Sequence, residues 1–462
     1  MKFGPPAKNI RTLLIAITAS AAVALGATAA AAGPEAALLI DADSGRVLYA
    51  ENATTPWYPA SVTKIMTAYV TLKAVKEGRI SMDKLLTVSE NAAAQQPAKM
   101  GFQPGTTLTV ENALKMMMVK SANDMAVVLA EGVSGSIENF ATEMNRTAAR
   151  LGMTQTSYVN PNGLPADGQI TSARDLAILA RAAIRDLPEY ELYWHISAIK
   201  FGRRVMRNYN TLIDRYPGAD GMKTGFICAS GFNLVATATR GGRRLIAVVL
   251  GSRSGMQRAE KAAQLLERGF TGGGGLSWLI PAFGTVDGLQ PIDAAPPNLR
   301  DDICNAKGRR RPPSDAEAAT TQAEESTSSL AMMAGFQLGP PRAGLIGPLQ
   351  PSMAPIVVYT GPVKSPTALE QLASAPDRET KKRAKKSGTQ AASTQAAPDA
   401  APKPAAKPGA KPAAKTAAKP ASGDAKVAPA KPAAAKPASA EPAAKPKPKP
   451  KPKPVAATQS KQ

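Results

Sequence analysis

Three short groups of polar residues in this chain have the types and the spacing that nucleophilic chemistry requires. They are Ser61 with Lys64, Ser121 with Asn123, and the run Lys223-Thr224-Gly225. Positions three residues apart share one face of a helix, so the amine of Lys64 can reach the hydroxyl of Ser61. A lysine amine acts as a general base once its pKa has fallen. The spacing therefore predicts a serine nucleophile with a lysine base.

The other side chains of these groups can serve the same reaction. The positive charge of Lys223 would lower the pKa of Lys64, and together with the Thr224 hydroxyl it suits a terminal carboxylate of a substrate. Ser121 can relay a proton between Lys64 and the leaving group, and the Asn123 amide can hold the substrate backbone. The three groups thus predict catalytic and substrate-binding residues in one site.

The same segments offer backbone donors to an oxyanion. Ser61 begins a helical stretch, where its own N–H and the positive end of the helix dipole can face a developing negative charge. Gly225 leaves room for a substrate backbone along a strand edge, and the N–H of the next residue, Phe226, can complete the oxyanion hole.

Each group also recurs or has a simpler structural interpretation. Ser-x-x-Lys recurs at 81–84 and 197–200, Ser-x-Asn at 89–91, and a Lys-Ser-Gly run at 386–388 imitates the third group. Taken alone, Ser61 could be a helix cap, residues 121–124 a capped turn between helices, and residues 223–225 the start of a strand. Only the set at 61, 121 and 223 places one group at a helix start, one between helices and one on a strand, which favours catalysis.

The elements around these groups predict one catalytic domain over residues 33–283. Alternating runs in "AALLIDADSGRVLYAEN" and "GFNLVATATRGGRRLIAVVLGS" predict two hairpins, the second turning at Gly241-Gly242. Apolar residues at three- and four-residue spacing predict helices in "VENALKMMMV", "DMAVVLAEGV" and "ARDLAILARAAI", and "RAEKAAQLLERGF" predicts a closing helix. These elements indicate an α/β (α+β) fold, with one antiparallel sheet built from both ends of the domain and a helical insert. A cleft between sheet and insert is the expected site.

The N-terminus has the pattern of a secretory signal peptide over residues 1–32. Lys2, Lys8 and Arg11 precede the apolar stretch 13–25, and small residues follow it. The apolar stretch is short for a retained span, although an uncleaved anchor is the alternative. We therefore expect an exported protein of the periplasm or cell envelope, either free there or peripheral to the membrane.

Export also decides how the two cysteines are interpreted. Cys228 and Cys304 would lie in an oxidising compartment, and we expect them to be bridged. Two cysteines and the single histidine, His195, cannot furnish a typical four-ligand zinc site, so no metal and no cofactor are expected. Without a Gly-x-Ser-x-Gly elbow near any serine, a Ser-His-Asp triad is not expected either.

The C-terminal part of the chain changes in composition. Residues 284–380 form a Pro/Gly-rich extension without a clear domain, in which the run "APIVVYTGP" could lie as a strand on the preceding domain. Residues 381–462 hold 19 Lys or Arg against three acids, a net +16 of the chain's +22, and no aromatic residue. Such a Lys/Pro/Ala tail cannot bury enough apolar surface to order itself and is expected to be disordered.

The expected partner of this tail follows from export. Nucleic acid, the usual partner of so many positive charges, is not expected outside the cytoplasm. An anionic membrane or envelope surface is the expected partner, held by screened attraction. The alternative is a solvated spacer with no fixed partner.

The three groups and their surroundings resemble the penicillin-recognising serine enzymes, and among them the D-alanyl-D-alanine carboxypeptidases (low-molecular-mass penicillin-binding proteins). The resemblance covers roughly residues 34–270. It includes the segments "LIDADSGRVLYAENATTPWYPASVTKIMTAY", "VKSANDMAVVLAE", "NPNGLPADGQITSARDLA" and "ADGMKTGFICASGFNLVATA". It implies a β-lactamase/transpeptidase-like fold.

The resemblance also implies a two-step acyl transfer on peptidoglycan stem peptides. Ser61 would attack the penultimate D-alanine carbonyl, D-alanine would leave, and water would release the acyl-enzyme. By position, Lys64 corresponds to the general base, Ser121 and Asn123 to the second motif, and Lys223 to the carboxylate-binding lysine. Inhibition by β-lactam antibiotics follows, since they acylate the same serine.

Two departures from the family pattern bear on function. Many members carry a polar residue, often histidine, after Lys-Thr-Gly, whereas this chain has Phe226. Members often have a β-rich second domain and a C-terminal amphipathic anchor, but the chain after residue 284 shows no convincing β-rich run and ends in Lys-Pro-Ala repeats. The usual mode of membrane attachment is therefore not expected.

Three competing functions remain at this stage. A D,D-endopeptidase cutting peptidoglycan cross-links would need the same groups and differ only in pocket shape. A class A β-lactamase would need a Glu-x-x-Leu-Asn segment, and no glutamate between Ser121 and Lys223 begins one. A catalytically silent cell-wall-binding module would not need the intact set of three groups. The carboxypeptidase interpretation is the one that the sequence favours.

Overall fold

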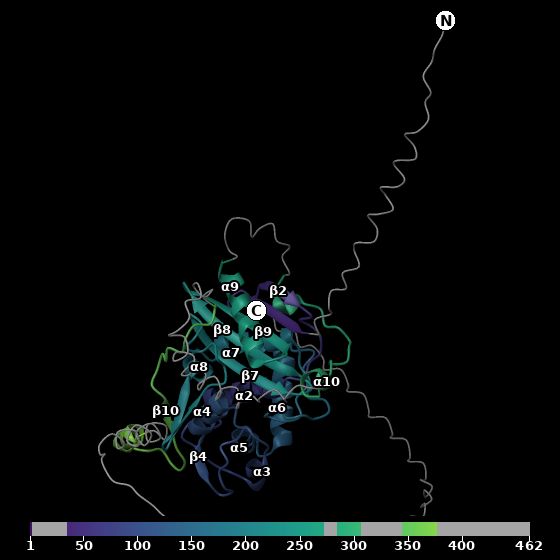
Figure 1. Ribbon diagram of the computed structural model, residues 1–462. Helices are drawn as coiled ribbons and strands as arrows, with labels where there is room; N and C mark the ends of the chain where they lie inside the picture. The colour runs from purple at the N-terminus through teal and green to yellow at the C-terminus, as the bar shows by residue number, and fades with distance from the viewer. Residues whose placement is uncertain (2–34, 272–283, 306–343, 377–462) are drawn as a thin grey trace, which may run out of the picture. The chain divides into compact units, whose positions relative to one another are not determined.

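The computed structural model describes residues 1, 35–271, 284–305 and 344–376 (Figure 1). The chain divides by its contacts into Met1–Thr394 and Gln395–Gln462, and all described residues belong to the first unit. The predicted signal peptide and the predicted basic tail lie outside the described residues, so both stay predictions.

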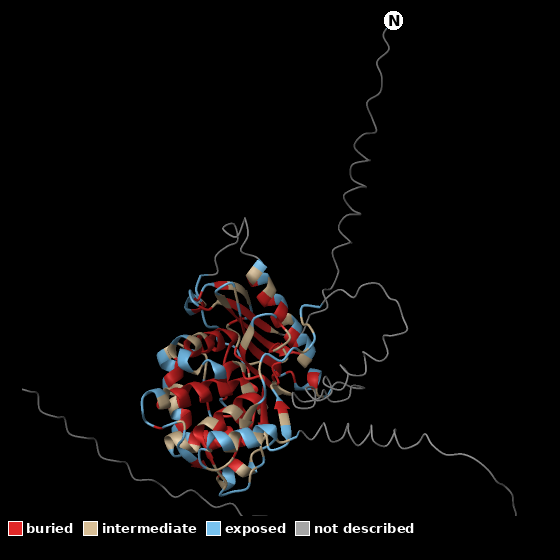
Figure 2. Cartoon of the chain, turned by 90° about the vertical axis from the view of Figure 1, so that its left-hand side faces the viewer, coloured by how far each residue is buried: buried red, intermediate tan, exposed pale blue. Residues whose placement is uncertain are grey.

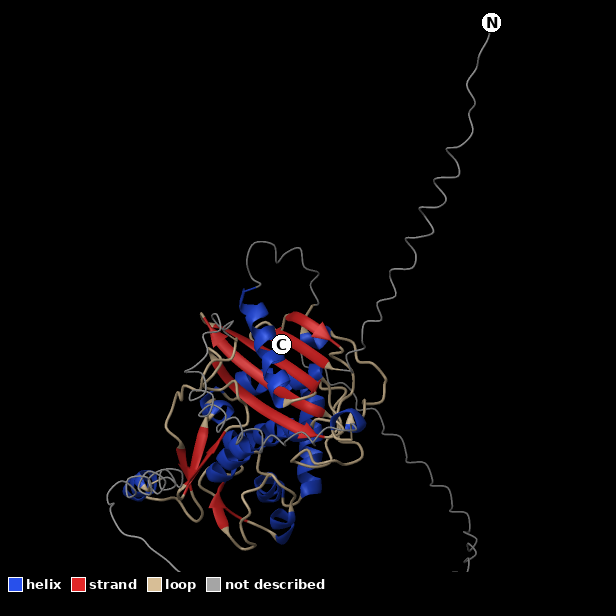
Figure 3. Cartoon of the chain, viewed as in Figure 1, coloured by secondary structure: helices blue, strands red, loops and turns tan. Residues whose placement is uncertain are grey.

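A five-stranded antiparallel sheet joins the two ends of the domain, as predicted (Figure 3). Its strands lie in the order β2 (Val47–Glu51), β1 (Ala36–Asp41), β9 (Arg243–Ser252), β8 (Gly231–Arg240) and β7 (Ala219–Ile227). In β1, Leu38 lies opposite Ala50 of β2 and Val248 of β9. The first strand of the domain therefore pairs with the last, and β7 forms one edge of the sheet.

Both faces of this sheet are buried, which explains the nearly continuous apolar run in β1. Leu38 and Ile40 face the core shared with the helical insert, whereas Ala37 and Leu39 face the helix α9 (Gly255–Thr271). Successive side chains of a strand point to opposite faces, so a strand covered on both sides needs apolar residues at every position. Figure 2 shows this buried core in red within the sheet and the helices packed on it.

The hairpin of β8 and β9 turns where the sequence predicts. Gly241 and Gly242 have φ angles of +55° and +74°. Tight hairpin turns with two positive φ angles match the twist of the strands and favour glycine. The prediction of this hairpin is confirmed, as is that of the closing helix α9 that follows it.

The helical insert lies between β2 and β7. Its longer helices are α2 (Lys64–Lys76), α4 (Val110–Lys120), α5 (Asn123–Ser134), α6 (Ile137–Leu151) and α7 (Ala173–Asp186). Its shorter elements are η1 (Ala60–Thr63), β3 (Leu85–Thr87), α3 (Glu90–Ala94), β4 (Thr107–Thr109), η2 (Pro188–Tyr190), α8 (Leu192–His195), β5 (Ala198–Phe201) and β6 (Arg204–Arg207). Side-chain caps start α4, α6 and α7 at Thr109, Ser136 and Ser172. The predicted helices α4, α5 and α7 are all present.

The described part of the C-terminal extension packs on this domain. It contains η4 (Val286–Gly288), α10 (Arg300–Ile303), β10 (Ile356–Val358) and α12 (Pro366–Ser374). β10 pairs in parallel with β5, in a three-stranded sheet of order β10-β5-β6. Lys200 Nζ donates to the carbonyls of Ala373 and Ala375 at the end of α12. The hypothesis that the run around β10 lies as a strand on the preceding domain is confirmed.

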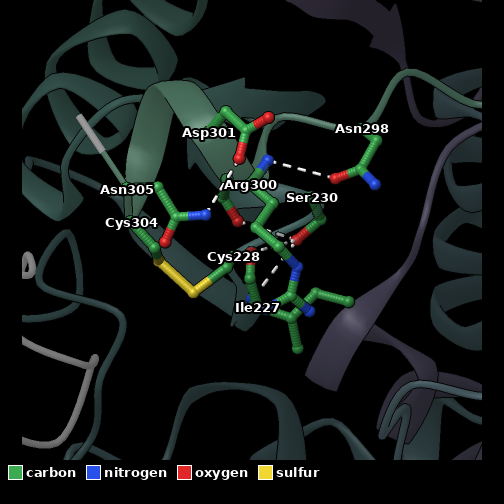
Figure 4. The surroundings of a disulfide bond; sticks show 9 residues. Ile227, Cys228, Ser230, Asn298, Arg300, Asp301, Cys304 and Asn305 are labelled. Atoms are coloured by element: carbon green, nitrogen blue, oxygen red, sulfur yellow. Dashed lines mark hydrogen bonds between the residues drawn. A yellow bond between two sulfur atoms is a disulfide. The ribbon is translucent and has the colours of Figure 1, made fainter.

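A disulfide ties the extension to the turn between β7 and β8. Cys228 and Cys304 are bonded with an S–S distance of 2.03 Å (Figure 4), which confirms the predicted pair. The N–H of Leu299 donates to the carbonyl of Ala229 beside the bridge. The segment through α10 is therefore anchored to the end of the strand that carries Lys223.

Within residues 35–271, 284–305 and 344–376, no helix is both long enough and apolar enough to cross a membrane.

Candidate active site

Lys64 forms the centre of the candidate site. It is fully buried at the start of α2, and its Nζ lies 2.9 Å from Ser61 Oγ. The same Nζ donates to Asn123 Oδ1 at 2.7 Å and to the carbonyl of Asn162 at 2.6 Å. Three partners from three segments of the chain thus fix the amine next to the Ser61 hydroxyl.

The alternative that Ser61 is only a helix cap is wrong. Ser61 is the second residue of η1, whose N-cap is Pro59, and no side chain caps either η1 or the following α2. The 121–124 segment is likewise no side-chain cap, because the N-cap of α5 is Ala122. Neither serine side chain therefore caps the N-terminus of a helix.

The electrostatic surroundings lower the pKa of Lys64 well below its ordinary value. The main cause is burial, which disfavours the charged amine, and the nearby charge of Lys223 acts in the same direction. The carboxylate of Asp124 opposes both, because it favours the charged amine. The predicted direction and the predicted contribution of Lys223 are confirmed.

The second group lies between α4 and α5. Ser121 is the C-cap residue of α4, with a left-handed backbone (φ +57°), and is almost fully buried. Asn123 begins α5, and while its Oδ1 accepts from Lys64, its Nδ2 donates to the carbonyl of Gln96 at 2.8 Å. The amide of Asn123 thus orients Lys64, and its contact with a substrate backbone stays a prediction, as does the proton relay by Ser121.

The third group lies on β7, at the edge of the sheet. Lys223 is fully buried. One of the interactions of its Nζ is a hydrogen bond to the Thr224 carbonyl at 3.3 Å. The Thr224 hydroxyl is buried and has no hydrogen-bond partner among the described residues. A buried hydroxyl without a partner is costly unless a ligand satisfies it, so this hydroxyl is suited to bind one.

Phe226 occupies the position after Lys-Thr-Gly, where many penicillin-recognising serine enzymes carry a polar side chain. It is half-buried, and its ring lies 4.2 Å from the ring of Phe232, with 31° between the two planes. The side chain therefore packs on the sheet and offers no hydrogen bond. The role of its backbone N–H as an oxyanion donor stays a prediction.

Gly225 brings β7 against the turn that carries Ser61. A Cβ at Gly225 would lie 2.9 Å from the backbone nitrogen of Ser61 and 3.0 Å from that of Val62. Gly163 approaches the same turn closely, and a Cβ there would lie 1.8 Å from the carbonyl oxygen of Ala60. Both glycines are required for the Ser61 turn to fit between its neighbours.

Sequence reasoning missed two contributors to this arrangement. The carbonyl of Asn162 accepts a hydrogen bond from Lys64. The side-chain amide of Asn162 donates to Gln95 Oε1. Asp124 is fully buried and accepts from the backbone nitrogens of Met100 and Gly101. The Pro-Asn-Gly and Ser-Ala-Asn-Asp strings were visible signals, but a loop carbonyl leaves no mark in residue types.

The recurring Ser-x-x-Lys pairs do not form such sites. Lys84 Nζ donates to the carbonyl of Gly132, and Lys200 Nζ is bound at the end of α12. The backbone N–H of Lys84 donates to the carbonyl of Ser81 at 3.2 Å, but its side-chain amine is directed to Gly132. Residues 81–84 form a turn before β3 rather than a helix start.

The described part of the chain contains no group of three or more His, Cys, Asp or Glu side chains that could hold a metal ion. His195 lies at the end of the short helix α8, away from the three groups in sequence.

Comparisons with known proteins agree with this arrangement. The family model described as D-alanyl-D-alanine carboxypeptidase (Peptidase_S11) matches residues 21–254. The D-alanyl-D-alanine carboxypeptidase DacF of Bacillus subtilis is 37% identical over 243 residues, covering 51% of this chain and 62% of DacF. DacC of Escherichia coli is 39% identical over 240 residues, covering 50% of this chain and 60% of DacC.

A solved structure is similar as well. That of penicillin binding protein 5 from Haemophilus influenzae has a TM-score of 0.50 and 37% identity, covering 51% of this chain and 70% of that one. The predicted fold class is thereby confirmed. The chain spans about three fifths of the length of the curated relatives DacF and DacC.

Proposed function

Because this chain belongs to the D-alanyl-D-alanine carboxypeptidase family (Peptidase_S11), we propose that it removes the terminal D-alanine from peptidoglycan stem pentapeptides through an acyl-enzyme on Ser61. The observation that carries this proposal is the buried amine of Lys64, 2.9 Å from Ser61 Oγ. The names of DacF and DacC support the same substrate class.

The first step begins with neutral Lys64. Its two N–H groups point to Asn123 Oδ1 and the Asn162 carbonyl, which leaves its lone pair facing the Ser61 hydroxyl. The amine takes the hydroxyl proton as Oγ attacks the carbonyl of the penultimate D-alanine. The oxyanion lies at the backbone N–H groups of Ser61 and Phe226, near the helix start of η1 and α2.

The second half of acylation releases D-alanine. Lys64 returns the proton to the amine of the leaving D-alanine, with the Ser121 hydroxyl as the relay, and the C–N bond breaks. The charge of Lys223 and the unpartnered hydroxyl of Thr224 bind the carboxylate of the terminal D-alanine. Water then attacks the ester with Lys64 again as base, which frees Ser61 and the shortened peptide.

Mass spectrometry of a stem pentapeptide incubated with the full chain tests this function. We expect a tetrapeptide and one equivalent of free D-alanine. A parallel incubation with cross-linked muropeptide dimers distinguishes a D,D-endopeptidase, which would split the dimer and leave the pentapeptide intact. An unchanged pentapeptide would contradict the proposal.

We propose that β-lactams acylate the same serine, and the pH dependence of that step gives a prediction. The charge of Lys223 lowers the pKa of Lys64, so Lys223→Met should raise that pKa. Neutral Lys64 would then form only at higher pH. The acidic limb of the acylation rate constant at saturating penicillin should therefore shift to higher pH in this variant.

The matched control for this shift is Lys84→Met, because Lys84 binds the carbonyl of Gly132 and does not contribute to the pKa of Lys64. Its pH profile should overlay that of the unmodified protein. A Lys223→Met profile that stays in place, or moves to lower pH, would contradict the coupling of the two lysines.

We propose that the protein is exported to the periplasm or cell envelope, with residues 1–32 as its signal peptide, and that residues 381–462 hold it at an anionic membrane or envelope surface. The support is the basic and apolar pattern of the N-terminus and the net charge of +16 over residues 381–462. Attraction of this kind is screened within about 8 Å at physiological ionic strength.

Ending the chain at residue 380 separates catalysis from this binding. Turnover of a small soluble D-Ala-D-Ala peptide should be unchanged, because every candidate catalytic residue lies before residue 230. Sedimentation with vesicles of anionic lipid should fall, and added salt should lower binding of the full chain in the same way. Binding that survives both truncation and high salt would contradict the tether.

A further inference from the structure

Asn233 is a fully buried polar residue whose side-chain amide donates hydrogen bonds to a segment outside its own sheet. It lies on β8, where its Cα pairs with that of Gly225 on β7. Its Nδ2 donates to the carbonyls of Tyr58 at 3.0 Å and Pro59 at 3.2 Å. These carbonyls belong to the two residues that precede Ala60 and Ser61.

The other side of this amide is held by an irregularity of the sheet. The pairing of β8 with β9 steps from Phe232–Ser252 to Leu234–Val249, so two residues of β9 face Asn233 alone. The freed N–H of Gly251 donates to Asn233 Oδ1 at 3.1 Å. Bulges of this kind re-aim a side chain, and here the amide is aimed past Gly225 at the Ser61 turn.

The turn that receives these bonds has a strained backbone. Ala60 has a φ of +49°, a left-handed conformation that is unfavourable for a residue with a Cβ. On its upstream side, the Trp57 indole donates to the Ser230 carbonyl at 3.0 Å. Without the bonds from Asn233, the segment between Trp57 and Ser61 would have less to hold it in this conformation.

We infer that Asn233 is a positioning residue for acylation, holding the carbonyls of Tyr58 and Pro59 so that the N–H and hydroxyl of Ser61 face the edge of β7. The inference rests on the proposed function. It explains why a carboxamide is buried at this position of β8, since that group alone donates to the two carbonyls while accepting from the Gly251 N–H.

The variant Asn233→Asp tests this with almost no change of volume. The new oxygen would face the two carbonyl oxygens in place of a donor, which displaces the turn. A displacement of about 1 Å at a reacting group can cost on the order of 10²-fold in rate. At alkaline pH we expect the acylation rate constant at saturating fluorescent penicillin to fall by about that factor, with the dissociation constant nearly unchanged.

The pH profile separates positioning from a general loss of stability. Burial raises the pKa of an aspartate, and its protonated form can donate to one of the two carbonyls. The rate deficit of Asn233→Asp relative to the unmodified protein should therefore shrink as the pH falls. A deficit that is equal at every pH, or an unchanged rate constant, would overturn the inference.

Asn112→Asp is the matched control. Asn112 is equally buried, in the first turn of α4, and its amide donates to Thr109 Oγ1 and accepts from the Tyr359 N–H. The same change there should lower the unfolding temperature but leave the acylation rate constant unchanged. An equal loss of acylation in both variants would overturn the inference.

Two further outcomes keep the test decisive. If Asn233→Asp does not fold, Asn233→Ala removes the donor without adding a repulsive oxygen, and an unchanged rate constant in that variant would overturn the inference. If the unmodified protein is not labelled by penicillin at all, the proposed function fails. Normal labelling of the unmodified protein and of both Asn233 variants overturns only the role of Asn233.

Discussion

Replacement of Ser61 by alanine should abolish both covalent labelling by a fluorescent penicillin and the release of D-alanine. The Ser61 hydroxyl is the group that the buried amine of Lys64 approaches to 2.9 Å, and in the proposed mechanism the acyl-enzyme forms on its oxygen. Removing the nucleophile of a serine hydrolase costs on the order of 10⁶-fold in turnover. The variant should remain folded, since only one partly buried oxygen atom is lost.

The serines of the other Ser-x-x-Lys pairs supply the controls. Ser81→Ala and Ser197→Ala should keep both activities, because the lysines three residues after them bind the Gly132 carbonyl and the end of α12. Gel fluorescence after labelling measures the covalent step in all three variants. Persistent labelling of Ser61→Ala would place the nucleophile elsewhere.

Replacement of Lys64 by methionine should have the second largest effect. Methionine keeps the length and the apolar stem of the lysine, so the fully buried site stays filled while the proton acceptor is removed. Loss of a positioned general base lowers the rate on the order of 10²–10⁴-fold. We expect the acylation rate constant to fall by a factor in that range and to lose its acidic limb.

Stopped-flow labelling across pH, with thermal unfolding beside it, makes this measurement. A folded Lys64→Met protein that acylates at the unmodified rate would move the base to another residue, with Ser121 the next candidate. A profile that keeps its acidic limb in this variant would show that another group titrates there.

The parts of the fold that the sequence predicts are those set by short-range patterns. Alternation in the β1–β2 hairpin and the Gly241-Gly242 turn determine local pairing, and helical periodicity determines α4 and α7. The pairing of β5 with β10 joins residues 199 and 356, and only an apolar run hinted at it. Parallel pairing over such a separation depends on packing that no local pattern encodes.

The residues of the candidate site likewise divide into those that the sequence predicts and those that only the structure reveals. The sequence predicts Ser61, Lys64 and Lys223 as site residues because their side-chain types suit the chemistry, and the structure places Lys223 where it lowers the pKa of Lys64. The Asn162 carbonyl was not found, because a backbone acceptor has no residue-type signal. The sequence does not reveal Asn233 for another reason: the partners of an amide within a strand become known only once the strand register is known.

Localising the covalent adduct tests the central claim most directly. After acylation by benzylpenicillin and acid quenching, trypsin should release the peptide of residues 47–64, which lies between Arg46 and the cleavage site after Lys64. Fragmentation in the mass spectrometer should assign the added mass to Ser61. An adduct on Ser121, or no adduct on any serine, would contradict Ser61 as the nucleophile of this protein.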